Sequence, residues 1–288
     1  MYRDCDHLVD DTHVYTIRGN WPNNETLVLA KPVYERETVR HSFEKIVDRK
    51  GVPGENLVWI NPHSYNHISC KGIDITKYSG DKLWDNMVKQ FLSIGITADN
   101  IGLFGSKRLN FKNCKDEDFI IYGRDNMKLL YDKINVFKEK VGLYNHTLMH
   151  AKYQEETHGK YFNTDNNHLL FCLLNKWSTC AFSDKHTTTI RFVDDKIYTG
   201  NILKKYMFQK DFSQSKTIVG VVSNAIETSF MPRIFYLNTL DHNEKIKVIT
   251  PLWIFHQCVK DNDLVAVTGT IVDGALVLRS YEHGIRFI

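Results

Sequence analysis

The sequence predicts an α+β fold in three consecutive parts: a β-hairpin region, a mixed sheet with flanking helices, and a small β-barrel. Three observations lead to this prediction. Two strand patterns around a turn begin the chain, helix and strand signals alternate in the middle, and strand follows strand towards the C-terminus. We therefore place the three parts at residues 1–80, 81–214 and 215–288.

The composition is that of a globular protein. Of the 288 residues, 42% are hydrophobic and 25% are charged, which excludes a disordered or fibrous chain. Lysine and arginine number 37 against 34 aspartate and glutamate, so the formal net charge is only +3. That charge falls short of the concentrated positive charge of a dedicated DNA-packaging protein.

The chain carries no signal for export or membrane insertion. It starts with the acidic, polar run MYRDCDHLVDD, and its longest apolar clusters, such as LLFCLL at 169–174, are far too short to span a bilayer. Its six cysteines are scattered without a CxxC pair, which argues against a zinc ribbon or a disulfide framework. We expect a cytoplasmic protein with reduced thiols, and the oligomeric state stays open.

The first part combines a hairpin with a polar helix. Residues 13–19 and 26–34 have strand character, and WPNNE between them supplies turn chemistry. The polar stretch 36–51 is compatible with a helix that ends at Gly51. Residues 57–68 contain a proline that must interrupt any strand there.

The middle part alternates helices with short apolar strands. Apolar residues at helical spacing, or long amphipathic patterns, predict the helices, and short apolar runs ending in glycine or rich in β-branched residues predict the strands. The predicted helices are 81–95, 126–142 and 166–177, and the predicted strands are 100–106, 118–123 and 187–193.

The last part consists almost entirely of strand patterns separated by turns such as VDGA, DNDL and EHG. Strands at this spacing, with no helix of convincing length, indicate a small closed or half-closed barrel of the OB type. The predicted strands are 216–223, 233–240, 245–255, 263–272, 275–281 and 284–288.

The residues most capable of chemistry lie between the first two strands of the middle part. Gly105 and Ser106 end one apolar run, and nine residues separate them from Asp116, which with Asp118 leads into the next. Alternation along a strand places Asp116 and Asp118 on one face and Glu117 on the other. Two carboxylates on one face can bind the same divalent cation, which suits Mg²⁺ or Mn²⁺.

The Gly-Ser pair is suited to phosphate. Gly105 and Ser106 offer backbone N–H groups and a hydroxyl where no Cβ obstructs Gly105, and Lys107 and Arg108 add positive charge beside them. Together with the carboxylates, these are the parts needed for a metal-assisted attack on a nucleotide α-phosphate.

This arrangement resembles the signature of the DNA polymerase beta-like nucleotidyltransferase superfamily. Members of that superfamily have Gly-Ser and then, after a spacer, Ser-Asp-x-Asp-Leu; here Lys115 stands for the second serine and Phe119 for the leucine. The resemblance implies a nucleotidyltransferase-type mixed sheet, in which Asp116 and Asp118 are catalytic metal ligands. It also implies that Gly105 and Ser106 bind the nucleotide.

The chain is also similar, over most of its length, to a predicted archaeal-type nucleotidyltransferase family of unknown role. That family has a strand hairpin before the Gly-Ser motif, a Lys-Trp element after it, and a closing β module. The matching segments here are 15–34, Asn175-Lys176-Trp177, 220–237 and 263–272.

One departure from the superfamily concerns the third carboxylate, which members place on the strand after the motif. The corresponding strand, 187–193, offers Thr189 and Arg191 instead. Asp194 and Asp195 lie just past its end and could serve only if the strand were shifted. Arg191 is therefore a candidate phosphate contact.

Other readings stay open for several residues. Asp-Glu-Asp at 116–118 is also a common solvated triplet, and Gly-Ser is a common turn. Two further sets have features of metal sites or of phosphate contacts, but surface positions explain them as well. The spaced histidines are His63, His67, His146, His150 and His158, and the basic run contains Lys204, Lys205 and Tyr206.

The sequence favours an enzyme that moves a nucleoside monophosphate from a nucleoside triphosphate (NTP) to an acceptor, with Asp116 and Asp118 holding the metal. A second hypothesis is a catalytically weak or inactive transferase fold that acts as a nucleic-acid-binding module through its barrel. A small-molecule acceptor is a third. The acceptor, nucleic acid or small molecule, cannot be chosen from fold resemblance.

Overall fold

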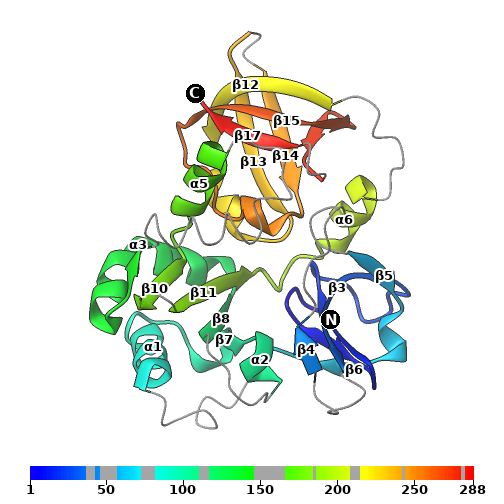
Figure 1. Cartoon of the computed structure of the whole chain (residues 1–288), viewed down its shortest axis with the longest axis vertical. Coiled ribbons are helices and arrows are strands. Elements are labelled where there is room, and N and C mark those ends of the chain that lie inside the picture. The colour runs from blue at the N-terminus through cyan, green and yellow to red at the C-terminus, as the bar shows by residue number, and fades with distance from the viewer. Residues whose placement is uncertain are drawn as a thin grey trace.

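The computed structural model describes ten segments of the chain. They are residues 1–36, 43–45, 57–72, 82–109, 117–145, 166–183, 186–207, 215–241, 244–279 and 283–288. These segments form a mixed α+β structure with three sheets and few helices. In Figure 1 the N-terminal sheet and the middle sheet lie side by side at one end of the long axis, and the barrel forms the other end. None of the described helices has both the length and the apolar character that crossing a bilayer requires.

The N-terminal sheet is antiparallel, with β4, β3, β2, β1 and β6 in that order and β5 also paired to β3. Its apolar face is closed by a cluster around Leu8, Ile17 and Trp21. The strands are β1 (His7–Val9), β2 (His13–Ile17), β3 (Val28–Arg36), β4 (Phe43–Lys45), β5 (Val58–Ile60) and β6 (Asn66–Ile68).

The helix expected over residues 36–51 is wrong where the structure describes this stretch. Arg36 is the last residue of β3, and Phe43–Lys45 form β4, which pairs with the end of β3. The exposed edge of a long strand offers backbone hydrogen bonds that override a helix-compatible pattern. The rest of 37–51 lies outside the described residues.

The middle sheet has the order β7, β8, β11, β10, β9, and only its central pair, β8 and β11, is parallel. Two long helices, α1 and α3, confirm the predicted helical patterns and cover one face of the sheet. The elements are β7 (Ile101–Leu103), β8 (Glu117–Tyr122), β9 (Tyr144–Asn145), β10 (Thr179–Ser183), β11 (His186–Val193), α1 (Lys82–Ser93), α2 (Gly105–Arg108) and α3 (Arg124–Val141).

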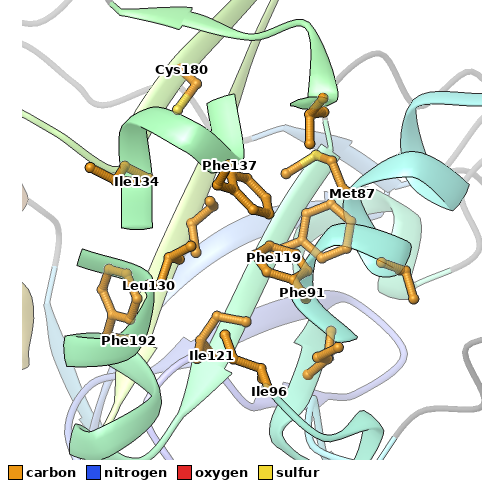
Figure 2. Packing of buried hydrophobic residues seen from close by; sticks show 14 of the residues in the cluster. Met87, Phe91, Ile96, Phe119, Ile121, Leu130, Ile134, Phe137, Cys180 and Phe192 are labelled. Carbon is orange, nitrogen blue, oxygen red and sulfur yellow. The ribbon is translucent and has the colours of Figure 1, made fainter. Parts of the chain in front are cut away.

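Strand β8 is buried on both faces. Phe119 and Ile121 point to the helices, where Phe119 stacks on Trp84 with ring centroids 4.6 Å apart. Figure 2 shows this side of the sheet, with Phe91 and Phe119 meeting beneath the helices. On the other face, Ile120 and Tyr122 lie in a cluster that includes Cys5 and Cys70 of the N-terminal part. The sheet is therefore sandwiched between its helices and the N-terminal part.

The C-terminal part is a closed barrel of five strands. Strands β12, β13, β14, β16 and β15 pair in that order, and β15 pairs back to β12, while β17 adds to β15 outside the circuit. The strands are β12 (Ser215–Ser223), β13 (Arg233–Thr239), β14 (Lys245–Thr250), β15 (Leu264–Val272), β16 (Ala275–Val277) and β17 (Gly284–Phe287).

Two helices join the barrel to the other parts. Helix α5 (Asn166–Leu174) contributes Cys172 and Leu173 to the barrel core, and it ends three residues earlier than the predicted 166–177. Helix α6 (Gly200–Met207) packs Leu203 into the N-terminal cluster and Tyr206 against the barrel. The basic run of α6 is also paired, since Lys204 contacts Glu25 at 2.7 Å and Lys205 contacts Asp273 at 3.3 Å.

Candidate functional site

The turn after β7 brings Gly105 against the carboxylate of Asp118. Strand β7 ends at Leu103, Phe104 N donates to the backbone oxygen of Asp118 at 3.1 Å, and the chain turns at Gly105 with φ +73°. A Cβ at Gly105 would lie 3.1 Å from Asp118 Oδ2. Only glycine accepts this φ without strain. The Gly-Ser turn and one of the two predicted carboxylates therefore share one site.

The register of the parallel pair shows what lies beside Asp118. Asp118 is opposite Thr189 and Ile120 is opposite Arg191, so Thr189 occupies the position next to the carboxylate. Alternation places Asp118, Thr189 and Arg191 on the same face of the sheet. The described part of this strand pair thus offers a hydroxyl and a guanidinium where the superfamily resemblance implies a third carboxylate.

Asp194 and Asp195 do not reach this site. They follow the end of β11, and Asp194 lies five residues beyond Thr189, which is about 16 Å along an extended strand. Arg124 forms an ion pair with Asp194, and Lys71 forms one with Asp195. The strand shift that would have brought them near Asp118 is absent from the register of β8 and β11.

Arg191 is buried and held in a fixed environment. Its guanidinium stacks over the ring of Phe104, 4.4 Å from the centroid, and Nη1 lies 3.9 Å from Cys5 Sγ. Burial alone would lower the pKa of Arg191, but Cys5 and the carboxylates of Asp118 and Asp4 together raise it. Burial raises the pKa of Cys5 to about 12, so at neutral pH the carboxylates carry this effect.

Arg108 joins the site from α2. Its Nε and Nη2 donate to the backbone oxygen of Ser69, at 2.9 and 2.6 Å, which ties α2 to the N-terminal part. The structure therefore brings together three of the predicted residues, Gly105, Asp118 and Arg191, and places Arg108 at the other end of α2 from Gly105. Ser106 and Lys107 belong to α2 by their backbone. Asp116 lies outside the described residues.

The donor chemistry near Asp118 fits a hard cation. A carboxylate and a hydroxyl are oxygen ligands of the kind that Mg²⁺ and Mn²⁺ take. The described segments contain no group of three or more His, Cys, Asp or Glu that could hold a metal, and Asp116 lies outside these segments. Of the spaced histidines, His67 Nε2 lies 2.9 Å from Asp6 Oδ2, and His63 Nδ1 lies 3.4 Å from the hydroxyl of Tyr2.

The N-terminal residues in this site were not predicted from the sequence. Asp4, Cys5, Asp6 and His7 are all buried beside the sheet face that carries Asp118. The run DCDH at 4–7 gathers four chemistry-bearing residues, and that density was the signal available. Its place in the site depends on contacts across more than 180 residues of chain, such as the one from Cys5 to Arg191.

A separate pocket of about 130 Å³ lies where the three parts meet, at the carboxyl end of β11. Arg124 lines it and forms ion pairs with Asp194 and with Glu227 of the barrel. Burial alone would lower the pKa of Arg124, but hydrogen bonds to these two carboxylates raise it. We interpret this pocket as a junction between parts, because its main polar groups are paired with one another.

Comparisons with protein-family models, with curated proteins and with solved structures find no match to this chain. The assignment of a function therefore rests on the geometry of the site.

Proposed function

We propose that this chain is a metal-dependent nucleotidyltransferase of the DNA polymerase beta-like type, which transfers a nucleoside monophosphate from an NTP to an acceptor. One observation carries the proposal: the Gly105 turn contacts the carboxylate of Asp118 across neighbouring strands. A turn that exposes backbone to phosphate, set against a metal-binding carboxylate, is the arrangement that phosphoryl-transfer chemistry needs.

Each described residue has a role in this proposal. Asp118, with Asp116 of the same motif, would hold Mg²⁺ or Mn²⁺. When bound, the metal neutralises phosphate charge and polarises the α-phosphate. Gly105, which lacks a Cβ, lets the carboxylate of Asp118 lie against the turn whose backbone would bind the triphosphate, and Arg108 and Arg191 would balance the negative charge of the phosphates. Fixing the phosphates in this way aligns the α-phosphate for in-line attack.

The barrel supports an acceptor-binding role. Its closed order of five strands is compatible with an OB-like module. On the outer face, Tyr236 is opposite Lys247 in the ladder, and Lys245 Nζ lies 4.6 Å from the centroid of the Tyr236 ring. An aromatic ring with two lysines beside it suits a single-stranded nucleic acid, through base stacking and phosphate contacts.

A second candidate function is supported by Thr189 and Arg191. With a hydroxyl next to Asp118 and a guanidinium two residue pairs further along, the described site carries less negative charge than a complete metal triad. Such a site would bind phosphate more readily than metal. In that case the chain is a catalytically weak transferase fold that binds nucleic acid through its barrel.

The experiment that tests the proposal is incubation with each α-labelled NTP, Mg²⁺ and candidate acceptors, with product masses measured by mass spectrometry. We expect transfer by the wild type, and a loss of at least about 10²-fold in Asp118→Asn, the scale of losing one preorganised charge contact. Asp132→Asn, on the exposed side of α3, is the matched control and should retain transfer.

Two results decide between the candidates. If the wild type binds NTP but shows no transfer with any acceptor, the weak-transferase candidate is favoured. If NTP binds with equal affinity to the wild type and to the Asp118→Asn and Asp116→Asn double variant in the presence of Mg²⁺, the site lies elsewhere and the proposal fails.

A further inference from the structure

His7 lies at the start of β1, where the N-terminal sheet abuts the middle sheet. It pairs with Thr16 of β2 on one side and with Ile68 of β6 on the other. The next residue, Leu8, belongs to the core of the N-terminal sheet, so alternation turns His7 to the opposite face. His7 is only 1% exposed.

One of the two ring nitrogens of His7 lacks a hydrogen-bond partner in the described part of the chain. Nδ1 lies 3.2 Å from the hydroxyl of Thr16, whereas Nε2 is buried with no partner there. A buried polar atom without a partner costs free energy, and such atoms in native structures call for an explanation. A ligand that supplies the missing partner is one such explanation.

The surroundings of His7 indicate what kind of ligand this is. The guanidinium of Arg108 donates a hydrogen bond to the backbone oxygen of Ser69. Ser69 follows Ile68, the strand partner of His7. Burial lowers the pKa of the His7 ring to about 4; Asp6 and a backbone hydrogen bond with Tyr15 oppose this shift, and Arg108 and Arg191 add to it. The ring is thus neutral at pH 7 and lies close to two guanidinium groups.

The nearest carboxylate is already engaged. Asp6 accepts hydrogen bonds from Cys70 N at 2.8 Å and from Arg3 N at 3.1 Å, and it contacts His67 at 2.9 Å. Its capacity is used within the N-terminal part. A ligand that enters beside His7 therefore meets a ring nitrogen and two guanidinium groups, and of these Arg191 also interacts with Asp118 and Asp4.

We propose that His7, Arg108 and Arg191 bind the phosphate chain of a polyphosphate ligand, with His7 Nε2 donating to a phosphate oxygen. The negative charge of a bound phosphate favours the protonated form of the ring, in which both nitrogens carry a proton and Nε2 can donate. Two guanidinium forks and one ring N–H supply donors spread over several directions, which matches a chain of phosphates better than a single carboxylate.

This inference rests on the proposed function and deepens it, since it adds a residue of the N-terminal part to the nucleotide site. The same chemistry can come from the donor NTP or from the 5′-triphosphate end of a nucleic-acid acceptor. Both present the same phosphate chain to the three side chains.

The test is titration calorimetry of the full chain with inorganic pyrophosphate in the absence of divalent metal. We expect His7→Leu to weaken binding about tenfold or more, as for one lost hydrogen bond to a charged group. His7→Gln, which keeps an N–H donor, should retain part of the affinity. His13→Gln, on the neighbouring strand and paired with Glu35, is the control and should bind as the wild type does.

Displacement of pyrophosphate by ATP and by a 5′-triphosphorylated oligonucleotide identifies the source of the phosphates. For a variant that does not fold, the nitrogen resonances of the His7 ring in the wild type replace the affinity measurement, and they should shift on adding pyrophosphate. An unshifted ring, or equal pyrophosphate affinity in folded His7→Leu, would overturn the role of His7 while leaving NTP binding intact. If the wild type binds neither pyrophosphate nor NTP, the proposed function itself is wrong.

Discussion

Lys176 is the residue whose charge is most strongly affected by folding among the described lysines. It is 5% exposed between α5 and β10, and its ammonium lies 4.2 Å from the centroid of the Trp253 ring in the barrel. Burial lowers the pKa of Lys176 to about 7; the nearby thiols oppose the shift, and Arg233 and Arg191 add to it. Folding therefore works against the charged form of this side chain.

We predict that Lys176→Met raises the free energy of unfolding near pH 6–7 by about 2–5 kcal/mol, because it removes the cost of an ionised amine in a buried seam. The sign follows from proton binding. Between pH 7 and about 10.4, the unfolded Lys176 holds a proton that the folded one does not, so the contribution of Lys176 to wild-type stability rises with pH in this window.

That rise should be absent in Lys176→Met, and Lys128→Met on the exposed side of α3 should leave it unchanged. Urea unfolding at several pH values between 6 and 10 measures it. Identical pH dependence in the wild type and Lys176→Met would show that Lys176 is protonated, and compensated, in the folded protein.

At the scale of elements, helices and strands with long sequence patterns were predictable, and the shortest strands were not. Helices α1 and α3 have extended amphipathic spacing, and β8 and the barrel strands are apolar runs bounded by turns, so local patterns alone indicate them. Strands β1 and β6 have three residues each, and they exist because they pair with each other and, through β1, with β2. Pairing between distant segments is invisible to a local pattern.

The residues of the candidate site also fall into two groups: those that local sequence predicts and those that depend on contacts between distant parts of the chain. Gly105 and Asp118 were predicted because the turn and the strand are close in sequence, and both belong to one strand pair. His7 and the packing of Arg191 on Phe104 were not, because they depend on how the N-terminal part docks on the sheet. The absence of a third carboxylate on β11 was visible in the sequence, but only the register shows that Thr189 is the residue beside Asp118.

Helix α6 supplies a prediction at this scale, because its first residue has no room for a side chain. A Cβ on Gly200 would lie 2.2 Å from a ring atom of Trp21, which is fully buried. We predict that Gly200→Ala lowers the free energy of unfolding by about 1–3 kcal/mol or more, as overpacking does. Asn201→Ala, at an exposed neighbouring position, should change it little.

Thermal unfolding followed by near-UV circular dichroism measures both changes, since Trp21 reports the packing of α6. A Gly200→Ala protein with wild-type stability would mean that α6 docks with enough freedom to move away from Trp21.

At the scale of the whole molecule, the three parts share their cores. The connection between β12 and β13 inserts Phe230 into the core of the middle sheet and Met231 into that of the N-terminal sheet. Conversely, helix α5, which precedes the barrel in the chain, places Cys172 and Leu173 in the barrel core. The boundary drawn near residue 215 therefore separates stretches of sequence with different patterns, while the packing crosses it in both directions.

We predict that a chain ending at Gln214 does not fold stably, although every described residue of the candidate site precedes that point. The truncation uncovers Leu173 and removes Phe230 from the middle core, and losing a buried phenylalanine side chain alone costs about 3–5 kcal/mol. Such losses consume much of the roughly 5–15 kcal/mol that stabilises a typical protein. Circular dichroism and thermal unfolding of the truncated and full chains measure this, and Phe230→Ala in the full chain isolates one contribution. A truncated chain that melts cooperatively and binds NTP as the full chain does would show instead that the barrel is an independent platform for the acceptor.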